Sequence, residues 1–142
     1  MKISKRGRYG IRLLIDLAEN CHANHVTLVS AAMRQSISAR YLEQVAIILR
    51  RAGFIRSIKG ASGGYALAKP AGEIVVGDVL RVLEGDMLIA DPPPADCGKL
   101  ERCIWRAVFE PLNRRIAEII DCETLASLIN VVTNADSLMY FI

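Results

Sequence analysis

The sequence lacks the long apolar run of a membrane-spanning helix, since no stretch approaches about 18 apolar residues in a row. It also lacks the apolar segment of a signal peptide, because the start MKISKRGRYG carries positive charge without such a stretch. A third absence concerns histidine. Both histidines precede the G-x-S-x-G pattern at residues 60–64, whereas a serine hydrolase needs a histidine after it. We therefore expect a cytoplasmic protein that does not contact membranes and is not an enzyme.

The charge of the chain is divided between its two halves. Residues 1–69 hold 12 basic and 3 acidic side chains, a net charge of +9, whereas residues 70–142 hold 6 basic and 12 acidic ones, a net charge of −6. This asymmetry favours a polyanionic partner for the N-terminal half only. Since the chain shows no export signal, its four cysteines are expected to be reduced, metal-bound or redox-active rather than a disulfide framework.

The segment Ser36 to Lys69 runs an amphipathic helix directly into a basic, glycine-rich hairpin. Helices are predicted at residues 9–20, from a Thr27 cap to about residue 34, and from a Ser38 cap to the stop at Gly53. Short strands are predicted at residues 54–58 and 65–68, joined by a glycine-rich tip. This order predicts a mainly α fold with a small β-wing, a winged helix-turn-helix.

The third predicted helix has one apolar and one polar face. Leu42, Val45, Ala46 and Leu49 point inward, while the outward face carries Arg40, Tyr41, Glu43 and Gln44. In the major groove of DNA, Gln44 can bond adenine, Glu43 can accept from cytosine, and Arg40 can reach guanine or phosphate. Tyr41 can instead be a core aromatic residue, and Arg50 and Arg51 can be merely solvated. On the wing, Arg56 and Lys59 can reach the DNA backbone.

The C-terminal half is predicted to form a dimer. A short helix at residues 75–83 is followed by a loop containing three prolines and then by the longest helical pattern, residues 99–120. Little chain remains to cover the apolar positions of that helix, Trp105 and Phe109 included, so we expect it to pack against a second subunit. The predicted division is a DNA-binding domain at 1–84, a sensor loop at 85–98, and a dimerisation helix with a C-terminal helix at 99–142.

Several motifs in this order resemble the Rrf-type family of bacterial winged-helix regulators. They are KISKRGRYGIRLLIDLA, SISARYLEQ, LRRAGFIRSIKGASGGYALAKP and VGDVLRVLEG, and together they span most of the chain. The resemblance implies a homodimeric regulator, expected to be a repressor, that reads a partly palindromic DNA operator. The predicted DNA-contacting residues are Arg8, Ser38, Arg40, Tyr41, Glu43, Gln44, Arg56, Lys59 and Gly60.

The resemblance also suggests a sensor site. Cys97 and Cys103 stand where cluster-binding members of the family place two of three cysteines, but Asp91 replaces the first cysteine and Arg106 replaces a histidine. Iron-sulfur clusters normally take four ligands, mostly thiolates. A [2Fe-2S] cluster on Cys97 and Cys103 would therefore need Asp91 or a group from the partner subunit.

Other interpretations of the chain stay open. The two thiols could form a reversible disulfide, or Cys103 could be a packing residue and Cys97 a loop thiol. The ends of the chain are most similar to the cysteine-metabolism repressors of the family. This favours a cofactor-free regulator of cysteine or sulfur metabolism, controlled by a thiol or a regulatory protein partner. The alternative from another class is an interaction module that binds nucleic acids without sequence preference.

Overall fold

The computed structural model describes residues 1–21 and 24–139, and it shows a mainly helical chain with one two-stranded sheet. The prediction of a mainly α winged helix-turn-helix with a small β-wing is confirmed. Residues 22–23 of the loop after the first helix, and 140–142 of the predicted segment 99–142, lie outside the described residues. Within the described ranges, no helix has both the length and the apolar character needed to span a membrane.

Helices α1 (Lys5–Glu19), α2 (Leu28–Gln35) and α3 (Ala39–Arg51) form the helix-turn-helix body. The capping predictions for α2 and α3 are confirmed, since Thr27 Oγ1 accepts from the N–H of Ser30 and Ser38 Oγ from that of Tyr41. The predicted start of the first helix at Tyr9 is wrong. Helix α1 begins four residues earlier because Ser4 Oγ accepts from the N–H of Arg6 and caps it.

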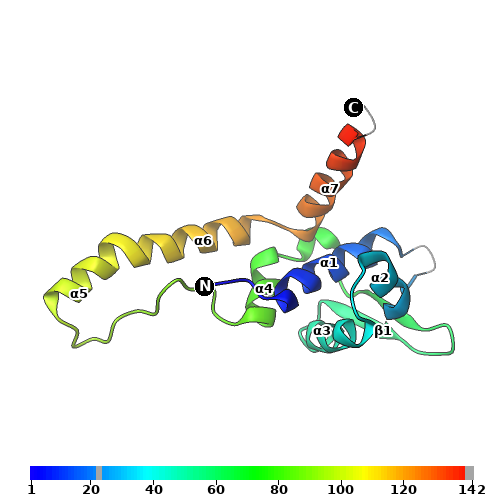
Figure 1. Cartoon of the computed structure of the whole chain (residues 1–142), viewed down its shortest axis with the longest axis horizontal. Coiled ribbons are helices and arrows are strands. Elements are labelled where there is room, and N and C mark those ends of the chain that lie inside the picture. The colour runs from blue at the N-terminus through cyan, green and yellow to red at the C-terminus, as the bar shows by residue number, and fades with distance from the viewer. Residues whose placement is uncertain (22–23, 140–142) are drawn as a thin grey trace.

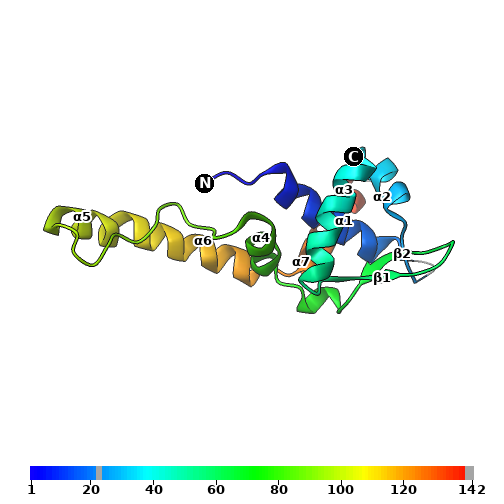
Figure 2. The same cartoon turned by 90° about the horizontal axis from the view of Figure 1, so that it is seen from below.

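The wing consists of β1 (Ile55–Ile58) and β2 (Gly64–Leu67), which pair antiparallel with Ile55 opposite Leu67 and Ile58 opposite Gly64. Tyr65 on β2 also pairs with Val26, so the base of the wing is joined to the segment before α2. Figure 2 shows the wing projecting from the end of the body opposite to α5.

The hydrophobic core lies among α1, α2, α3, the base of the wing and α4 (Val76–Glu84). Its fully buried large side chains include Leu13, Leu17, Leu42, Leu49, Ile55, Ile74 and Leu83. All four residues predicted to face inward from α3 are buried. The core therefore fixes α3 from behind and leaves its opposite face free.

The long C-terminal helix is an arm that extends away from the body (Figure 1). It comprises α5 (Lys99–Ile104), a π-helical segment (Trp105–Phe109) and α6 (Glu110–Cys122). Pro111 lacks an N–H and its ring would clash with the carbonyl of Ala107 in a regular helix. The π-helical segment just before it, where Glu110 N–H donates to the carbonyl of Trp105, accommodates the proline without ending the helix.

After the arm, the chain returns to the body through a short backbone bridge. The N–H of Val76 donates to the carbonyl of Glu123 (2.9 Å), and the N–H of Leu125 donates to that of Ile74 (2.8 Å). The segment just before Ile74, Ala71–Glu73, forms a single 3₁₀ turn. Helix α7 (Leu125–Met139) thus starts with Leu125 buried in the core and then projects from it (Figure 1).

Candidate DNA-binding interface

The outer face of α3 is exposed and mostly polar. Arg40, Glu43 and Gln44 are exposed, and Ile47 is exposed one turn further along. These residues recur at spacings of three and four, so they lie on one side of the helix, opposite to the buried side chains. This side presents the donors and acceptors that can read base edges, as the sequence predicts.

A buried ion pair fixes the turn that leads into α3. The Asp16 carboxylate on α1 is 1% exposed and accepts from Arg34 Nη2 (2.6 Å), Arg34 Nε (3.0 Å) and Gln35 Nε2 (3.1 Å). Burial alone would raise the pKa of Asp16, but the hydrogen bonds from Arg34 and Gln35 and the charge of Arg34 hold it below its usual value of 3.8. This network ties the end of α2 to α1 and so sets the position of α3.

The wing side of α3 borders a groove of about 450 Å³. Glu43 lines this groove together with Lys59 and Gly60 of the wing tip and Thr27 before α2. Gly60 has a φ of +121°, which favours glycine, and no heavy atom lies within 4 Å of where its side chain would be. The predicted wing-tip residues thus lie beside the predicted base-reading residue Glu43, and Arg56 is exposed on β1.

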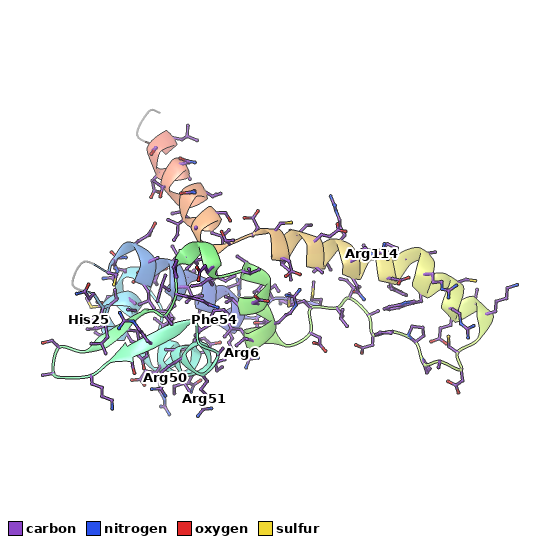
Figure 3. All side chains as sticks on the ribbon, turned by 180° about the vertical axis from the view of Figure 1, so that it is seen from behind. Arg6, His25, Arg50, Arg51, Phe54 and Arg114 are labelled. Atoms are coloured by element: carbon purple, nitrogen blue, oxygen red, sulfur yellow. The ribbon has the colours of Figure 1, made fainter. Side chains whose placement is uncertain are left out.

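The opposite side of α3 borders a second groove, of about 420 Å³, formed with the start of α1. Ser4 and Arg6 line it together with Gln44 and Tyr41. Arg6 was not among the contact residues predicted from the sequence, although Arg8, two residues later, was. Figure 3 shows Arg6, Arg50 and Arg51 gathered on the side of the body where α3 lies.

Tyr41 is only half-exposed, because its ring packs against the edge of Tyr9 at a centroid distance of 5.6 Å and a plane angle of 85°. Arg12 in turn stacks over Tyr9 and donates to the carbonyl of Gln35 (2.6 Å). Arg8 is exposed one helical turn before Arg12. Tyr41 therefore contributes to packing between α1 and α3, which is the core role that the sequence left open for it.

Arg51 was not predicted from the sequence as a contact residue, although a signal for it exists. It follows Arg40, Gln44 and Ile47 at spacings of four, three and four residues, so it extends the same exposed face of α3. Arg50 follows Glu43 by seven residues and therefore lies toward its side of the helix. Both guanidinium groups thus continue the basic surface toward the C-terminal end of α3.

The three candidate metal ligands do not form one site within the described part of a single chain. Asp91 lines a cavity of about 430 Å³ between the loop and the arm, whereas Cys97 lines a separate one with Arg102 and Arg106. Cys103 is exposed and lines neither. No group of three or more His, Cys, Asp or Glu side chains suited to a metal ion occurs in residues 1–21 and 24–139. One chain alone therefore does not fit an iron-sulfur cluster.

The loop after α4 lies along the arm, beside the arm's aromatic residues. Asn113 of α6 accepts from the N–H of Ile89 (2.7 Å) and donates to the carbonyl of Ala90 (2.9 Å), so it holds the loop in place. Trp105 and Phe109 line the cavity beneath the loop and are not fully exposed. They lie against the protein's own loop, and their dimer contact stays a prediction.

The adjoining face of the arm is apolar and exposed, and its Leu100 and Ile104 line the same cavity as Trp105 and Phe109. Leu100, Ile104, Val108 and Leu112, spaced four residues apart, are between 44% and 75% exposed, and Ile119 continues this surface at 57%. We call these five residues the arm stripe. No residue of α5, of the π-helical segment or of α6 is fully buried.

Comparisons with known proteins agree with this geometry. The Rrf2 family profile, described as iron-dependent transcriptional regulators, matches residues 3–131. The HTH-type transcriptional regulator CymR of Bacillus subtilis (strain 168) is 37% identical over 132 residues, which cover 90% of this chain and 89% of the relative. Among solved structures, CymR, the global cysteine regulator of B. subtilis, aligns with a TM-score of 0.77 at 35% identity and covers 92% of this chain and 98% of that one.

The structure of T. potens IscR aligns with a TM-score of 0.76 at 36% identity and covers 95% of this chain and 90% of that one. Each match spans the body and most of the arm. The likeness therefore extends beyond the winged helix to the whole described architecture. The chain belongs to the Rrf2 family of transcriptional regulators, which bind DNA and are not enzymes.

Proposed function

We propose that this protein is a cytoplasmic homodimeric repressor that reads a partly palindromic DNA operator. Residues 1–84 bind DNA, residues 85–98 form the regulatory loop, and residues 99–142 carry the dimerisation helix and C-terminal helix. The observation that carries the proposal is the exposed polar face of α3, bordered on one side by the wing tip and on the other by the start of α1. A helix of this kind fits the major groove of duplex DNA.

In this proposal the residues of α3 select the bases. Gln44 bonds adenine, Glu43 accepts from cytosine, and Arg40 reaches guanine or a phosphate. The other contacts position the protein on the phosphate backbone without selecting sequence. We assign Arg8, Ser38, Arg56, Lys59 and Gly60 to this second group, together with Arg6 and Arg51, and Tyr41 supports α3 from the side of α1.

The arm stripe supports a homodimer. An exposed apolar row along an extended helix is costly in water, and a second copy of the same helix can cover it. A two-fold dimer presents two α3 helices, which is what an operator of two related half-sites requires. Dimerisation by the arm therefore explains both the exposed stripe and the predicted operator symmetry.

For the signal that this regulator senses, the geometry supports control without a cofactor, through a thiol or a regulatory protein partner. Asp91 and Cys97 line different cavities, and Cys97 lies beside Arg102 and Arg106 rather than beside further ligands. The relative CymR is named a global cysteine regulator. We accordingly propose a role in cysteine or sulfur metabolism.

The [2Fe-2S] alternative is tested by purifying the protein without oxygen and measuring visible absorption, iron and acid-labile sulfide. A colourless, iron-free dimer that binds DNA is the expected result. Stoichiometric iron and sulfide that disappear in Cys97→Ser would instead establish a cluster, and the remaining ligands would then have to come from the partner subunit.

Operator recognition is tested by selecting duplexes from a randomised pool with the wild-type protein and repeating the selection with Gln44→Ala. We expect Gln44→Ala to relax base choice at one position of each half-site, at a cost of about 1–3 kcal/mol. An equal loss on every sequence would contradict direct readout by Gln44. Binding that collapses with salt and shows no sequence preference would favour the non-specific interaction module.

A further inference from the structure

The start of α1 is capped by a side chain from a distant part of the chain. Glu84, the last residue of α4, accepts three hydrogen bonds there through its carboxylate. They come from Ser4 Oγ (2.5 Å) and the backbone N–H groups of Ser4 (3.2 Å) and Gly7 (2.7 Å). Ser4 Oγ also accepts from the N–H of Arg6 (3.1 Å). A carboxylate on unpaired N–H groups at a helix start also interacts favourably with the helix dipole.

Two glycines of α1 make this close approach possible. A Cβ on Gly7 would lie 2.6 Å from Oε1 of Glu84, and a Cβ on Gly10 would overlap Cδ1 of Leu83. Both approaches are closer than real side chains allow. The two positions where α1 has no side chain are therefore the two positions where the end of α4 touches it.

The environment of Glu84 keeps it ionised. Burial alone would raise its pKa, but the hydrogen bonds from Ser4 and Gly7 and the charge of Arg6 hold the pKa below its usual value of 4.5. Arg6 lies between Ser4 and Gly7, on the turn whose N–H groups Glu84 binds. Arg6 is the residue that lines the groove beside Gln44 on α3.

We infer that Glu84 is a positioning residue for DNA binding, which holds the first turn of α1 so that Arg6 meets a DNA phosphate beside α3. This inference rests on the proposed function. Without Glu84, the N–H groups of Ser4 and Gly7 lose their acceptor and the first turn of α1 frays. Arg6 then loses its fixed place next to the groove, although the core that holds α3 is unchanged.

The direction in which DNA affinity changes on removal of Glu84 distinguishes a positioning role from a purely electrostatic one. A carboxylate near a DNA-binding surface repels phosphates, so removal of its charge alone would strengthen binding. Loss of positioning would weaken binding. Asp86, exposed two residues after Glu84, provides the matched control because Asp86→Asn removes the same charge from the same region.

The experiment measures the affinity of the full-length dimer for a mixed-sequence DNA duplex over a range of salt concentrations. The slope of log affinity against log salt falls by about 0.9 for each phosphate that the protein no longer neutralises. We expect Glu84→Ala to bind about tenfold more weakly and to reduce the slope by about 2, one phosphate per subunit. Asp86→Asn should bind as tightly as wild type or slightly more tightly.

Gly7→Ala gives a second test that leaves the net charge unchanged. Its added methyl group displaces the Glu84 carboxylate, so the slope should fall as it does in Glu84→Ala. This variant decides the question if Glu84→Ala does not fold. Glu84→Ala and Gly7→Ala both act through Arg6, so Arg6→Ala should show the same reduced slope. Combining Arg6→Ala with Glu84→Ala should reduce the slope no further.

A wild-type slope in both Glu84→Ala and Gly7→Ala would overturn the inference. So would a wild-type slope in Arg6→Ala, or an additional decrease when Arg6→Ala and Glu84→Ala are combined. If instead the wild-type protein itself binds duplex DNA without steep salt dependence, the proposed function fails rather than this inference. Mixed-sequence DNA suffices because phosphate contacts do not depend on sequence.

Discussion

The body and the arm differ in how their apolar side chains are covered. The body buries an extended core among α1, α2, α3 and α4 and adds a buried Asp16 with three hydrogen bonds. The arm, by contrast, has no fully buried residue, and its stripe of five aliphatic side chains faces solvent. The body therefore holds its shape within one chain, whereas the arm has the composition of half an interface.

The comparison also assigns different tasks to the two regions. The groups proposed to contact DNA all lie on the body, which has to present them rigidly, and in the proposed dimer the arm sets how two bodies are spaced. The regions meet where Arg81 of α4 donates to both carboxylate oxygens of Asp121 at the end of α6 (2.8 and 2.9 Å). Variants in the arm should thus change dimer assembly, and variants in the body should change the free energy of unfolding. Each kind of variant should have little effect on the other property.

The largest effect is expected from charges placed in the arm stripe. The double variant Ile104→Glu with Leu112→Glu should be monomeric and bind operator DNA at least about 100-fold more weakly, because one subunit no longer holds the other near its half-site. Its body should keep the wild-type unfolding temperature. Sedimentation equilibrium and thermal unfolding test both statements. Arg114→Glu, exposed on α6 two residues after Leu112 and so outside the stripe, is a control that stays dimeric. A dimeric double variant would show that the stripe is not the interface.

A smaller effect is expected in the body from Asp16→Ala. The change leaves Arg34 without its carboxylate and should lower the free energy of unfolding by about 2–3 kcal/mol. This is less than for a fully buried pair, since the Arg34 side chain is 38% exposed. Glu118→Ala on the arm removes an exposed ion pair and should change stability by less than about 0.5 kcal/mol. Urea unfolding measures the free energy of unfolding of both variants. Equal decreases in the two would contradict the difference described between body and arm.

Acid should affect the body through the same carboxylates. The pKa values of Asp16 and Glu84 are lowered in the folded state, so each contributes stability that is complete above its usual value, 3.8 or 4.5, and is lost as the pH falls through the lowered value. We expect the unfolding temperature to drop below these pH values. Asp16→Asn should show a shallower drop, and an acid profile identical to that of wild type would contradict the assigned role of Asp16.

The smallest effect is expected for single phosphate contacts of the body. Arg51→Ala should weaken binding to all duplexes about equally and reduce the salt slope by about 1 per subunit, with dimerisation and stability unchanged. Fluorescence anisotropy over a salt series measures this slope. A change in base preference would instead move Arg51 into the group that reads bases.

The sequence was sufficient for features that depend on local patterns. The period of Leu42, Val45 and Leu49 indicates which face of α3 is buried, and Ser38 indicates where the helix begins. The position of Arg51 on the exposed face could also have been predicted, because Arg51 continues the same helical spacing. These features need only residues within one helix, so spacing alone predicts them.

Other features depend on contacts between distant residues, which spacing does not reveal. Helix α1 starts at Lys5 with Ser4 as its cap, and Glu84, 80 residues away from Ser4, adds further hydrogen bonds to this end of the helix. Trp105 and Phe109 are partly buried, since a loop that ends before α5 is held beside them by Asn113. Apolar character identified both aromatic side chains as packing residues, but it did not indicate which surface they pack against.

Sequence-specific binding is measured in a competition assay with two DNA duplexes. The duplex selected by the wild-type protein is held at low concentration, and random duplex DNA is added in excess at physiological salt. We expect binding to survive, with a preference for the selected duplex of about 10³ or more, and Gln44→Ala to reduce this preference. Equal affinity for the selected and random duplexes would contradict this expectation.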